Sequence, residues 1–290
     1  MPSMRSLRLS RRSLLVSVVA MGLEAALPGR ARGASTVRVG MIPDAGGTQV
    51  SIDQKKPLRD YLAGKLGRDV ELVIPTNYNA TVEALGNGSL DFAYLGGLTY
   101  VKAHARYGVV PLVQRAGDRR FHSLFITQRA SAIHALRDLR GKKFAFGDIN
   151  STSGHLMPYY AMLKAGLDPE RDLTYRYTGN HPATAKAVEA AVVDAGALDE
   201  SVYRAMIDGG QLDKTKLRVF FTTPPFVDYV WVARKDVPAD DQRTFADAFL
   251  ALREPRQAPI LEILRGSSFV RATDDEYLTL RMVANKLQLL

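Results

Sequence analysis

The sequence predicts an α/β protein folded into two lobes, and three observations support this prediction. Strand-like and helix-like segments alternate along the chain, which is the pattern of sheets covered by helices. The same alternation begins again after residue 140. About 256 residues remain after an N-terminal export signal, enough for two lobes that each have a hydrophobic core.

In the first half of the chain, short apolar segments rich in β-branched and aromatic residues predict strands at residues 37–42, 70–74, 90–95 and 109–114. The segments between them predict helices at residues 57–66, 78–85 and 99–106. In the first helix Leu58, Leu62 and Leu66 share one face, because side chains four residues apart lie above one another. This order is typical of a parallel sheet covered by helices.

The second half repeats the pattern, with strands predicted at residues 144–146, 173–177, 195–198 and 219–222. Helices are predicted at 154–164 and 182–193, the second with Ala185, Val188 and Val192 as its inner stripe. Asp199 and Glu200 are expected to begin a solvated helix, because acidic residues are favoured at helix N-termini. From residue 240 onward the pattern predicts helices only.

The first 34 residues have the features of an export signal. Arginines precede a short apolar run at 14–23, and small residues follow at 31–34. The run is too short to cross a bilayer, and no later segment is long and apolar enough. The segment SRRSLL at 10–15 fits a twin-arginine signal, and an ordinary secretory signal is the alternative. We therefore expect an exported, soluble protein, without a lipid anchor because the chain has no cysteine to carry one.

Charge and composition exclude several classes of function. Removing the six arginines and one glutamate of the signal lowers the formal net charge from +9 to about +4. This charge is spread along the chain, so nucleic-acid binding is not expected, and only a weak attraction for small anions follows. The absence of cysteine excludes disulfides and thiolate chemistry. The five histidines form no recognisable metal motif, so neither a metal nor another cofactor is expected.

The segment Ser151-Thr152-Ser153-Gly154 is the strongest candidate for a binding site. It follows the predicted strand at 144–146 and stands where the next helix begins. A helix N-terminus offers unpaired N–H groups and a partial positive charge, and three hydroxyls add further hydrogen bonds for an anion. The alternative is that one of the serines only caps the helix.

Two β-rich segments flanked by charge are expected to cross between the lobes. They are residues 123–128 and 229–233. This prediction assigns 35–122 and 234–290 to lobe 1 and 129–228 to lobe 2. Lobe 1 is then discontinuous in sequence, and the two crossings are the expected hinge.

Five motifs in the same order resemble the phosphonate and phosphite type of substrate-binding protein of ABC transporters. They are DFAYLG at 91–96, FAFG followed by STSG at 144–154, GNH at 179–181, DAGA at 194–197 and PFVDYVW at 225–231. The resemblance covers essentially the whole chain after the signal. The segments LGGLT at 95–99, FHS at 121–123 and SGHLMP at 153–158 are also similar to proteins labelled selenate-binding components.

The resemblance implies a two-lobed periplasmic binding protein fold of type II-like topology, with the ligand cleft between lobes that close on a hinge. It assigns the anion oxygens to Ser151, Thr152 and Ser153. The other residues it implies are His181 as a hydrogen-bond donor, Asp228 as an acceptor and Tyr78 as a hydroxyl from the opposite lobe, with Tyr94 as a further candidate.

Each of these further residues also has a structural alternative. His181 could cap the helix that starts at Pro182, and Asp228 could pair with an arginine. Tyr78 and Tyr94 could be core aromatics. His155, close to the hydroxyl motif, is expected to be structural.

The function that follows is the periplasmic substrate-binding component of an ABC importer. Its expected partners are a small oxyanion and, transiently, an inner-membrane ABC permease, and the protein is expected to be monomeric. A ligand-binding partner of a membrane sensor kinase is an alternative, because the same fold serves both roles. A serine hydrolase using Ser151, His181 and Asp228 is disfavoured because G-x-S-x-G is absent, so no catalytic residue is assigned.

Asp228 also restricts the ligand. An ionised carboxylate only accepts hydrogen bonds, so it favours an oxyanion that keeps a proton, such as phosphonate, phosphite or phosphate. Selenite also meets this condition, whereas selenate does not. A phosphorus oxyanion is therefore the first expectation, and a selenate- or selenite-type oxyanion is the alternative.

Overall fold

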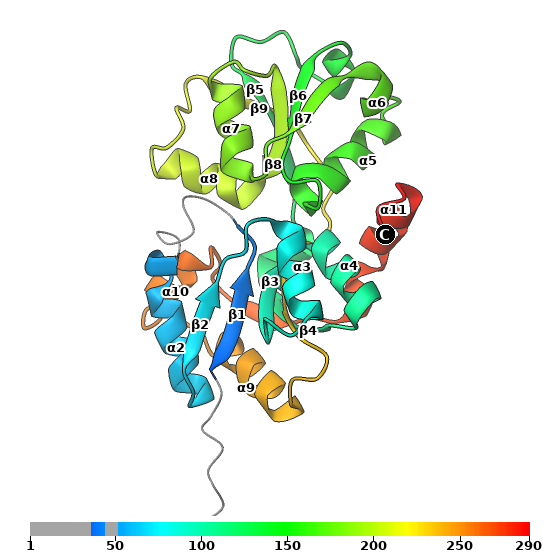
Figure 1. The fold of residues 1–290 in the computed structure, drawn as a ribbon. Helices are drawn as coiled ribbons and strands as arrows, with labels where there is room; N and C mark the ends of the chain where they lie inside the picture. Colours follow the sequence, from blue (N-terminus) through cyan, green and yellow to red (C-terminus); the bar gives the residue numbers. More distant parts are fainter. Residues whose placement is uncertain (1–35, 44–51) are drawn as a thin grey trace, which may run out of the picture. The chain divides into compact units, whose positions relative to one another are not determined.

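The computed structural model describes residues 36–43 and 52–290 (Figure 1). The export signal predicted at 1–34 lies outside the described residues. Two separate sheets, each flanked by helices, form the two-lobed α/β fold that the sequence predicts. No helix in the part of the chain that the structure describes is long and apolar enough to cross a membrane.

The first sheet has six strands in the order β11-β4-β10-β3-β1-β2. Strands β1 (Val37–Met41), β2 (Val70–Val73) and β3 (Phe92–Leu95) are parallel. Strand β10 (Val230–Ala233) lies antiparallel between β3 and β4 (Val110–Arg115).

Strand β11 corrects the expectation that the chain is only helical after residue 240. It spans Phe269–Arg271 and pairs antiparallel with the end of β4. A strand of three residues is too short to show an alternating pattern, so pairing with β4 rather than local sequence defines it.

The helices of the first lobe are α2 (Lys56–Leu66), α3 (Tyr78–Gly86), α4 (Gly97–Tyr107), α9 (Ala239–Leu250), α10 (Ala258–Ile263) and α11 (Leu278–Lys286). Aromatic side chains fill much of the core between the sheet and α9. The rings of Phe92 and Phe245 stack with their centroids 4.0 Å apart, and Trp231 packs on Phe245 and Phe249. These buried rings fix the orientation of β3 and β10, the strands that lead into the candidate site.

The second sheet has five strands in the order β7-β6-β8-β5-β9. They are β5 (Ser123–Gln128), β6 (Lys143–Phe146), β7 (Thr174–Tyr177), β8 (Ala195–Asp199) and β9 (Leu217–Thr222). Strand β6 is parallel to β7 and β8, whereas β5 is antiparallel to β8 and β9.

The helices of the second lobe are α5 (Met157–Lys164), α6 (Pro169–Asp172), α7 (His181–Glu189) and α8 (Glu200–Asp208). A π-helical turn, η3 (Thr152–Leu156), precedes α5, and the 3-10 turns are η1 (Ala116–Arg120), η2 (Leu136–Leu139) and η4 (Asp274–Tyr277). Because α7 ends at Glu189, Val192 lies beyond it and is half exposed, so the predicted inner stripe is wrong at this residue.

The two segments expected to cross between the lobes belong to the sheets. Residues 123–128 are β5 of the second sheet, and residues 230–233 are β10 of the first. The chain passes from one sheet to the other at residues 116–122 and 223–229. There Phe121 and Phe226 form an antiparallel bridge with N···O distances of 2.8 and 2.9 Å. We propose that the hinge lies at this bridge, and the predicted lobe limits stay a prediction.

Candidate functional site

Helix N-termini from both lobes meet at the candidate site. In the first lobe α3 follows β2 and α4 follows β3; in the second lobe η3, α7 and α8 follow β6, β7 and β8. Helices that follow parallel strands begin at the carboxyl edge of the sheet, where ligands of such folds bind. Each N-terminus carries unpaired N–H groups and a partial positive charge, so the arrangement favours an anion.

Contacts between the lobes bring these helix ends together. The Leu98 N–H of α4 donates to Thr152 Oγ1 at 2.9 Å. The Tyr78 hydroxyl, in the first turn of α3, lies 3.4 Å from Nε2 of His181, the first residue of α7. These two contacts join predicted site residues that are far apart in sequence.

The segment Ser151-Thr152-Ser153-Gly154, which we call the anion cradle, has three hydroxyls with different roles. Ser151 Oγ accepts from the Gly154 N–H at 2.9 Å and caps η3, which is the role that the capping alternative gives to one of the serines. Thr152 Oγ1 faces the opposite lobe through Leu98. Ser153 Oγ is buried and has no hydrogen-bond partner among the described residues. A buried hydroxyl without a partner is unfavourable, so Ser153 is the member of the motif that most needs a ligand.

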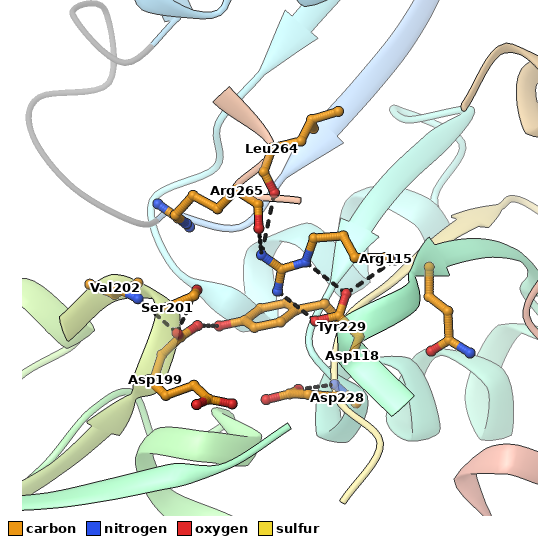
Figure 2. Close-up of polar contacts among 12 residues, drawn as sticks. Arg115, Asp118, Asp199, Ser201, Val202, Asp228, Tyr229, Leu264 and Arg265 are labelled. Carbon is orange, nitrogen blue, oxygen red and sulfur yellow. Dashed lines mark hydrogen bonds and ion pairs between the residues drawn. The ribbon is translucent and has the colours of Figure 1, made fainter. Parts of the chain in front are cut away.

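Asp228, like Ser153, has a buried side-chain oxygen without a hydrogen-bond partner among the described residues. Its Oδ1 accepts from the Gly97 N–H at the start of α4 at 2.9 Å, while its buried Oδ2 has no hydrogen-bond partner in the described part of the chain. The alternative of an arginine pair does not hold, because the nearby Arg115 pairs with Asp118 at 2.5 Å (Figure 2).

The environment of Asp228 raises its pKa to about 7. Burial is the main cause, and the charges of Asp199 and Asp118 add to it. Hydrogen bonds from the Gly97 N–H and the Thr152 hydroxyl act in the opposite direction but are weaker. Asp228 therefore titrates near neutral pH. This differs from the ionised carboxylate that the sequence predicts.

His181 is buried and its ring is held in one orientation. Nδ1 accepts from the Asp199 N–H at 3.3 Å, which places the proton of the neutral ring on Nε2. Asn180, not His181, caps α7, since its Oδ1 accepts from the Ala183 N–H at 2.8 Å. The capping alternative for His181 is therefore wrong, and its Nε2–H is directed towards the tyrosine hydroxyls.

Tyr229 and Asp199 are the site residues that sequence reasoning missed. The Tyr229 hydroxyl donates to Asp199 Oδ2 at 2.7 Å (Figure 2). It also lies 3.4 Å from His181 Nε2. Asp199 was expected at a solvated helix end; it does cap α8 but is fully buried. The PFVDYVW motif contains Tyr229, yet no local signal shows that its hydroxyl reaches a residue 30 positions away.

Asp199 stays ionised although it is buried. Burial alone would raise the pKa of its carboxyl, but the charges of Arg265 and Arg115, the Tyr229 hydrogen bond and the charge of His181 when its ring is protonated hold it below its ordinary value. Two buried carboxyls in one site therefore differ: Asp199 is a fixed negative charge, and Asp228 is the titrating one.

Tyr94 lies beside the site as a packed aromatic residue. Its ring stacks on Tyr229 with centroids 5.1 Å apart and tilts against Trp231. It lines the same cavity as Tyr78 and His181. The structure thus gathers the predicted residues Ser151, Thr152, Ser153, His181, Asp228, Tyr78 and Tyr94 around one region between the lobes.

His155, in the same turn as Ser153, is held by hydrogen bonds at both ring nitrogens. Its Nδ1 donates to the Ile149 carbonyl at 2.7 Å, and its Nε2 accepts from the Tyr177 hydroxyl at 3.0 Å. Burial lowers its pKa to about 4, so the ring stays neutral and keeps both bonds at neutral pH. The structural role expected for His155 matches this geometry.

The fold and the convergent helix ends are those of a two-lobed periplasmic binding protein. The chain matches the family described as the ABC transporter phosphonate periplasmic substrate-binding protein over residues 39–277. It belongs to this family.

Individual relatives agree with this assignment. The chain is 29% identical over 271 residues to the probable ABC transporter phosphite binding protein PhnD1 of Prochlorococcus marinus strain MIT 9301, covering 87% of this chain and 89% of that protein. It is 25% identical over 242 residues to the phosphonates-binding periplasmic protein of Escherichia coli K12, covering 80% and 71%. The structure of Prochlorococcus marinus PhnD1 in complex with methylphosphonate superposes with a TM-score of 0.81 at 28% identity, covering 88% of this chain and 99% of that one.

Proposed function

We propose that this chain is the substrate-binding component of an ABC importer and captures a small phosphorus oxyanion of phosphonate, phosphite or phosphate type. The observation that carries the proposal is a pair of buried polar atoms, Ser153 Oγ and Asp228 Oδ2, that have no hydrogen-bond partner among residues 36–43 and 52–290 and lie among converging helix N-termini. An oxyanion with one protonated oxygen would accept from the serine and donate to the carboxylate. The named relatives that bind phosphite or methylphosphonate support the same ligand class.

Each predicted residue then has a distinct role. Ser153 and the N–H groups of η3 hold the unprotonated oxygens, and Thr152 joins them by turning its single hydroxyl proton from Asp228 to the ligand, while Ser151 keeps the turn in shape. His181 donates from Nε2, Tyr78 adds a hydroxyl from the opposite lobe, and Asp228 accepts the ligand's proton. Tyr94 forms part of the wall behind them.

A binding role fits the geometry better than catalysis. Ser151 Oγ is occupied by the Gly154 N–H, and the Nδ1 atom of His181 is occupied by Asp199. Asp228 is bound to Gly97 instead of orienting the histidine. The serine, histidine and aspartate of a hydrolase relay are thus each engaged elsewhere.

The proposed setting is the periplasm, where a monomer delivers its ligand to an ABC permease of the inner membrane. Export by the predicted N-terminal signal is part of this proposal. A sensor-kinase partnership would use the same site and differ only in the membrane protein contacted.

A thermal-shift screen of residues 35–290 tests the ligand class. The panel is phosphate, phosphite, methylphosphonate, sulfate, selenate, selenite and arsenite. A ligand at 100 times its Kd stabilises the folded state by about 2.7 kcal/mol, which raises Tm by roughly 5–10 °C for a protein of this size. We expect this shift with at least one phosphorus oxyanion at pH 7.5. A panel in which only sulfate or selenate shifts Tm would contradict the proposal.

A further inference from the structure

A small cavity lies beside the proposed anion site. His181 and Tyr78 belong to both, and the rings of Tyr94 and Tyr229 continue the wall. The rest of the wall that the structure describes is mostly aliphatic, including Met41, Val202 and Ile263. A ligand held by the cradle therefore has an apolar surface next to it.

The polar groups of this wall offer little to a polar substituent. The Tyr229 hydroxyl already donates to Asp199 at 2.7 Å, and the Tyr78 hydroxyl lies against His181. An ammonium group placed there would lose its hydration against a mostly apolar wall. The chemistry of the wall therefore suits a small uncharged substituent.

The cavity is also very small. The space open to a water-sized molecule is about 10 Å³, which is roughly the room that one water needs. In the wild type, admitting a longer substituent requires the lobes to separate, and three hydrogen bonds between them oppose this: Tyr229 to Asp199 at 2.7 Å, Leu98 to Thr152 at 2.9 Å and Lys102 to Asn150 at 2.7 Å.

From this geometry we infer that the site selects phosphorus oxyanions whose substituent on phosphorus is hydrogen or methyl. The inference rests on the proposed function and adds the limit on the substituent. Phosphate is disfavoured because a fourth polar oxygen would be placed against the apolar wall, where it loses its hydrogen bonds to water. Ethylphosphonate is too long, and 2-aminoethylphosphonate is both too long and cationic.

Isothermal titration at pH 7.5 with phosphite, methylphosphonate, ethylphosphonate and 2-aminoethylphosphonate tests the inference. One methylene in a tight pocket changes selectivity by about 10- to 200-fold. We expect ethylphosphonate to bind at least tenfold more weakly than methylphosphonate, and 2-aminoethylphosphonate more weakly still. Equal affinity for the methyl and ethyl compounds would overturn the size limit while leaving the proposed function intact. No binding of any of the four, together with no thermal shift by phosphate, would overturn the proposed function itself.

A matched pair of variants locates the limit. Ile263→Ala enlarges the cavity, whereas Ile260→Ala makes the same change in the same helix at a residue outside the cavity wall. We expect Ile263→Ala to raise ethylphosphonate affinity at least tenfold relative to methylphosphonate and Ile260→Ala to leave the ratio unchanged. Val202→Ala, on α8 of the opposite lobe, is the second enlarging variant in case α10 does not tolerate the first. An unchanged ratio in both enlarging variants would overturn the assignment of this cavity.

Discussion

Thr152 is the residue of the cradle that contacts both lobes. It accepts a hydrogen bond from Leu98 of the first lobe, and its hydroxyl also lowers the pKa of Asp228. We expect Thr152→Ala to weaken oxyanion affinity ten- to hundredfold, because a hydrogen bond to a charged group contributes about 1.5–3 kcal/mol.

Thr127 provides the matched control for this change. It is also a buried threonine with a hydrogen-bonded hydroxyl, but it pairs with Ala195 at the start of β8, whereas the site lies at the end of that strand. Thr127→Ala is expected to lower stability without changing affinity measured by isothermal titration. Unchanged affinity in Thr152→Ala would remove the anion from this turn.

Asp228 makes ligand binding dependent on pH. The complex needs one proton between Oδ2 and the ligand oxygen, supplied by either partner. With the pKa of Asp228 at about 7 and the second ionisation of phosphate groups near 6, both lose it at alkaline pH. We expect affinity for methylphosphonate to be nearly constant between pH 6 and 7 and to fall about tenfold per pH unit above pH 8. Titration calorimetry between pH 6 and 9 measures this, and a flat profile in the wild type would contradict it.

The same pKa changes the expectation for selenate. The sequence alone predicts an ionised Asp228, which argues against any anion without a proton. A protonated Asp228 can donate to such an anion, so we expect weak selenate binding at pH 5.5 and none at pH 8.5. Asp228→Asn always offers an amide donor and should bind selenate similarly at both values. Tight selenate binding by the wild type at pH 8.5 would show that Asp228 does not face the ligand.

Asp228 also affects the stability of the free protein. Its pKa is raised in the folded state, so the folded protein holds the proton more tightly, and stability falls as pH rises from about 4 to 7. Asp228→Asn removes this ionisation. We expect the variant to be more stable than the wild type at pH 8 and to lose that advantage at pH 4, measured by urea unfolding without ligand. An equal difference at both values would contradict the raised pKa.

Among the elements, the turn that holds the cradle packs closely against α7. A Cβ added at Gly154 would lie 3.0 Å from His181 Cε1, 3.0 Å from Ser151 Oγ and 3.2 Å from Gly147 Cα. Gly154→Ala should therefore separate the cradle from His181 and cost about 1–3 kcal/mol of stability, as overpacking does. Ligand affinity should fall as well, because the two donors no longer meet.

Gly64 is the control for this prediction. It is exposed in α2, and an added Cβ would have nothing within 4 Å. Gly64→Ala should stabilise the protein by up to about 1 kcal/mol through helix propensity. The free energy of unfolding in urea is measured for both variants. A Gly154→Ala variant as stable as the wild type, or more stable, would exclude close packing at Gly154.

The sequence was sufficient to predict elements that carry a regular local pattern. The strands that became β1, β3 and β6 are short apolar runs, and the helix that became α2 has leucines at a spacing of four. It missed β11, whose three residues are defined by their partner β4, and it extended α7 past its end.

For the site as well, the sequence predicts what stands in a local motif and misses what depends on contacts between distant segments. Ser151, Thr152, His181 and Asp228 stand in short motifs that can be read along the chain, and the structure brings them together. The bond from Tyr229 to Asp199 depends on how two distant segments pack, so no local pattern contains it. The burial that raises the pKa of Asp228 is likewise a property of the folded site.

For the whole molecule, contacts between the lobes define a closed arrangement. Some involve residues of the proposed binding site, but Lys102 of α4 reaches Asn150 of the second lobe at 2.7 Å without being assigned to the ligand. Because the ligand contacts both lobes, it should bind the closed state more tightly and shift the population towards it. The hydrogen bond from Lys102 stabilises the same state independently of the ligand.

Asn150→Ala separates these two contributions, because it removes the Lys102 contact and leaves the proposed anion contacts in place. Small-angle scattering of the wild type should show a smaller radius of gyration with saturating methylphosphonate than without it. In Asn150→Ala the ligand-free radius should increase and the saturated radius should match that of the wild type, since closure then depends on the ligand alone. Affinity should fall only by the free energy of one hydrogen bond, about 0.5–1.5 kcal/mol, or roughly two- to tenfold. A wild-type radius that is identical with and without ligand would rule out ligand-driven closure, and an unchanged ligand-free radius in Asn150→Ala would show that Lys102 does not help to hold the lobes together.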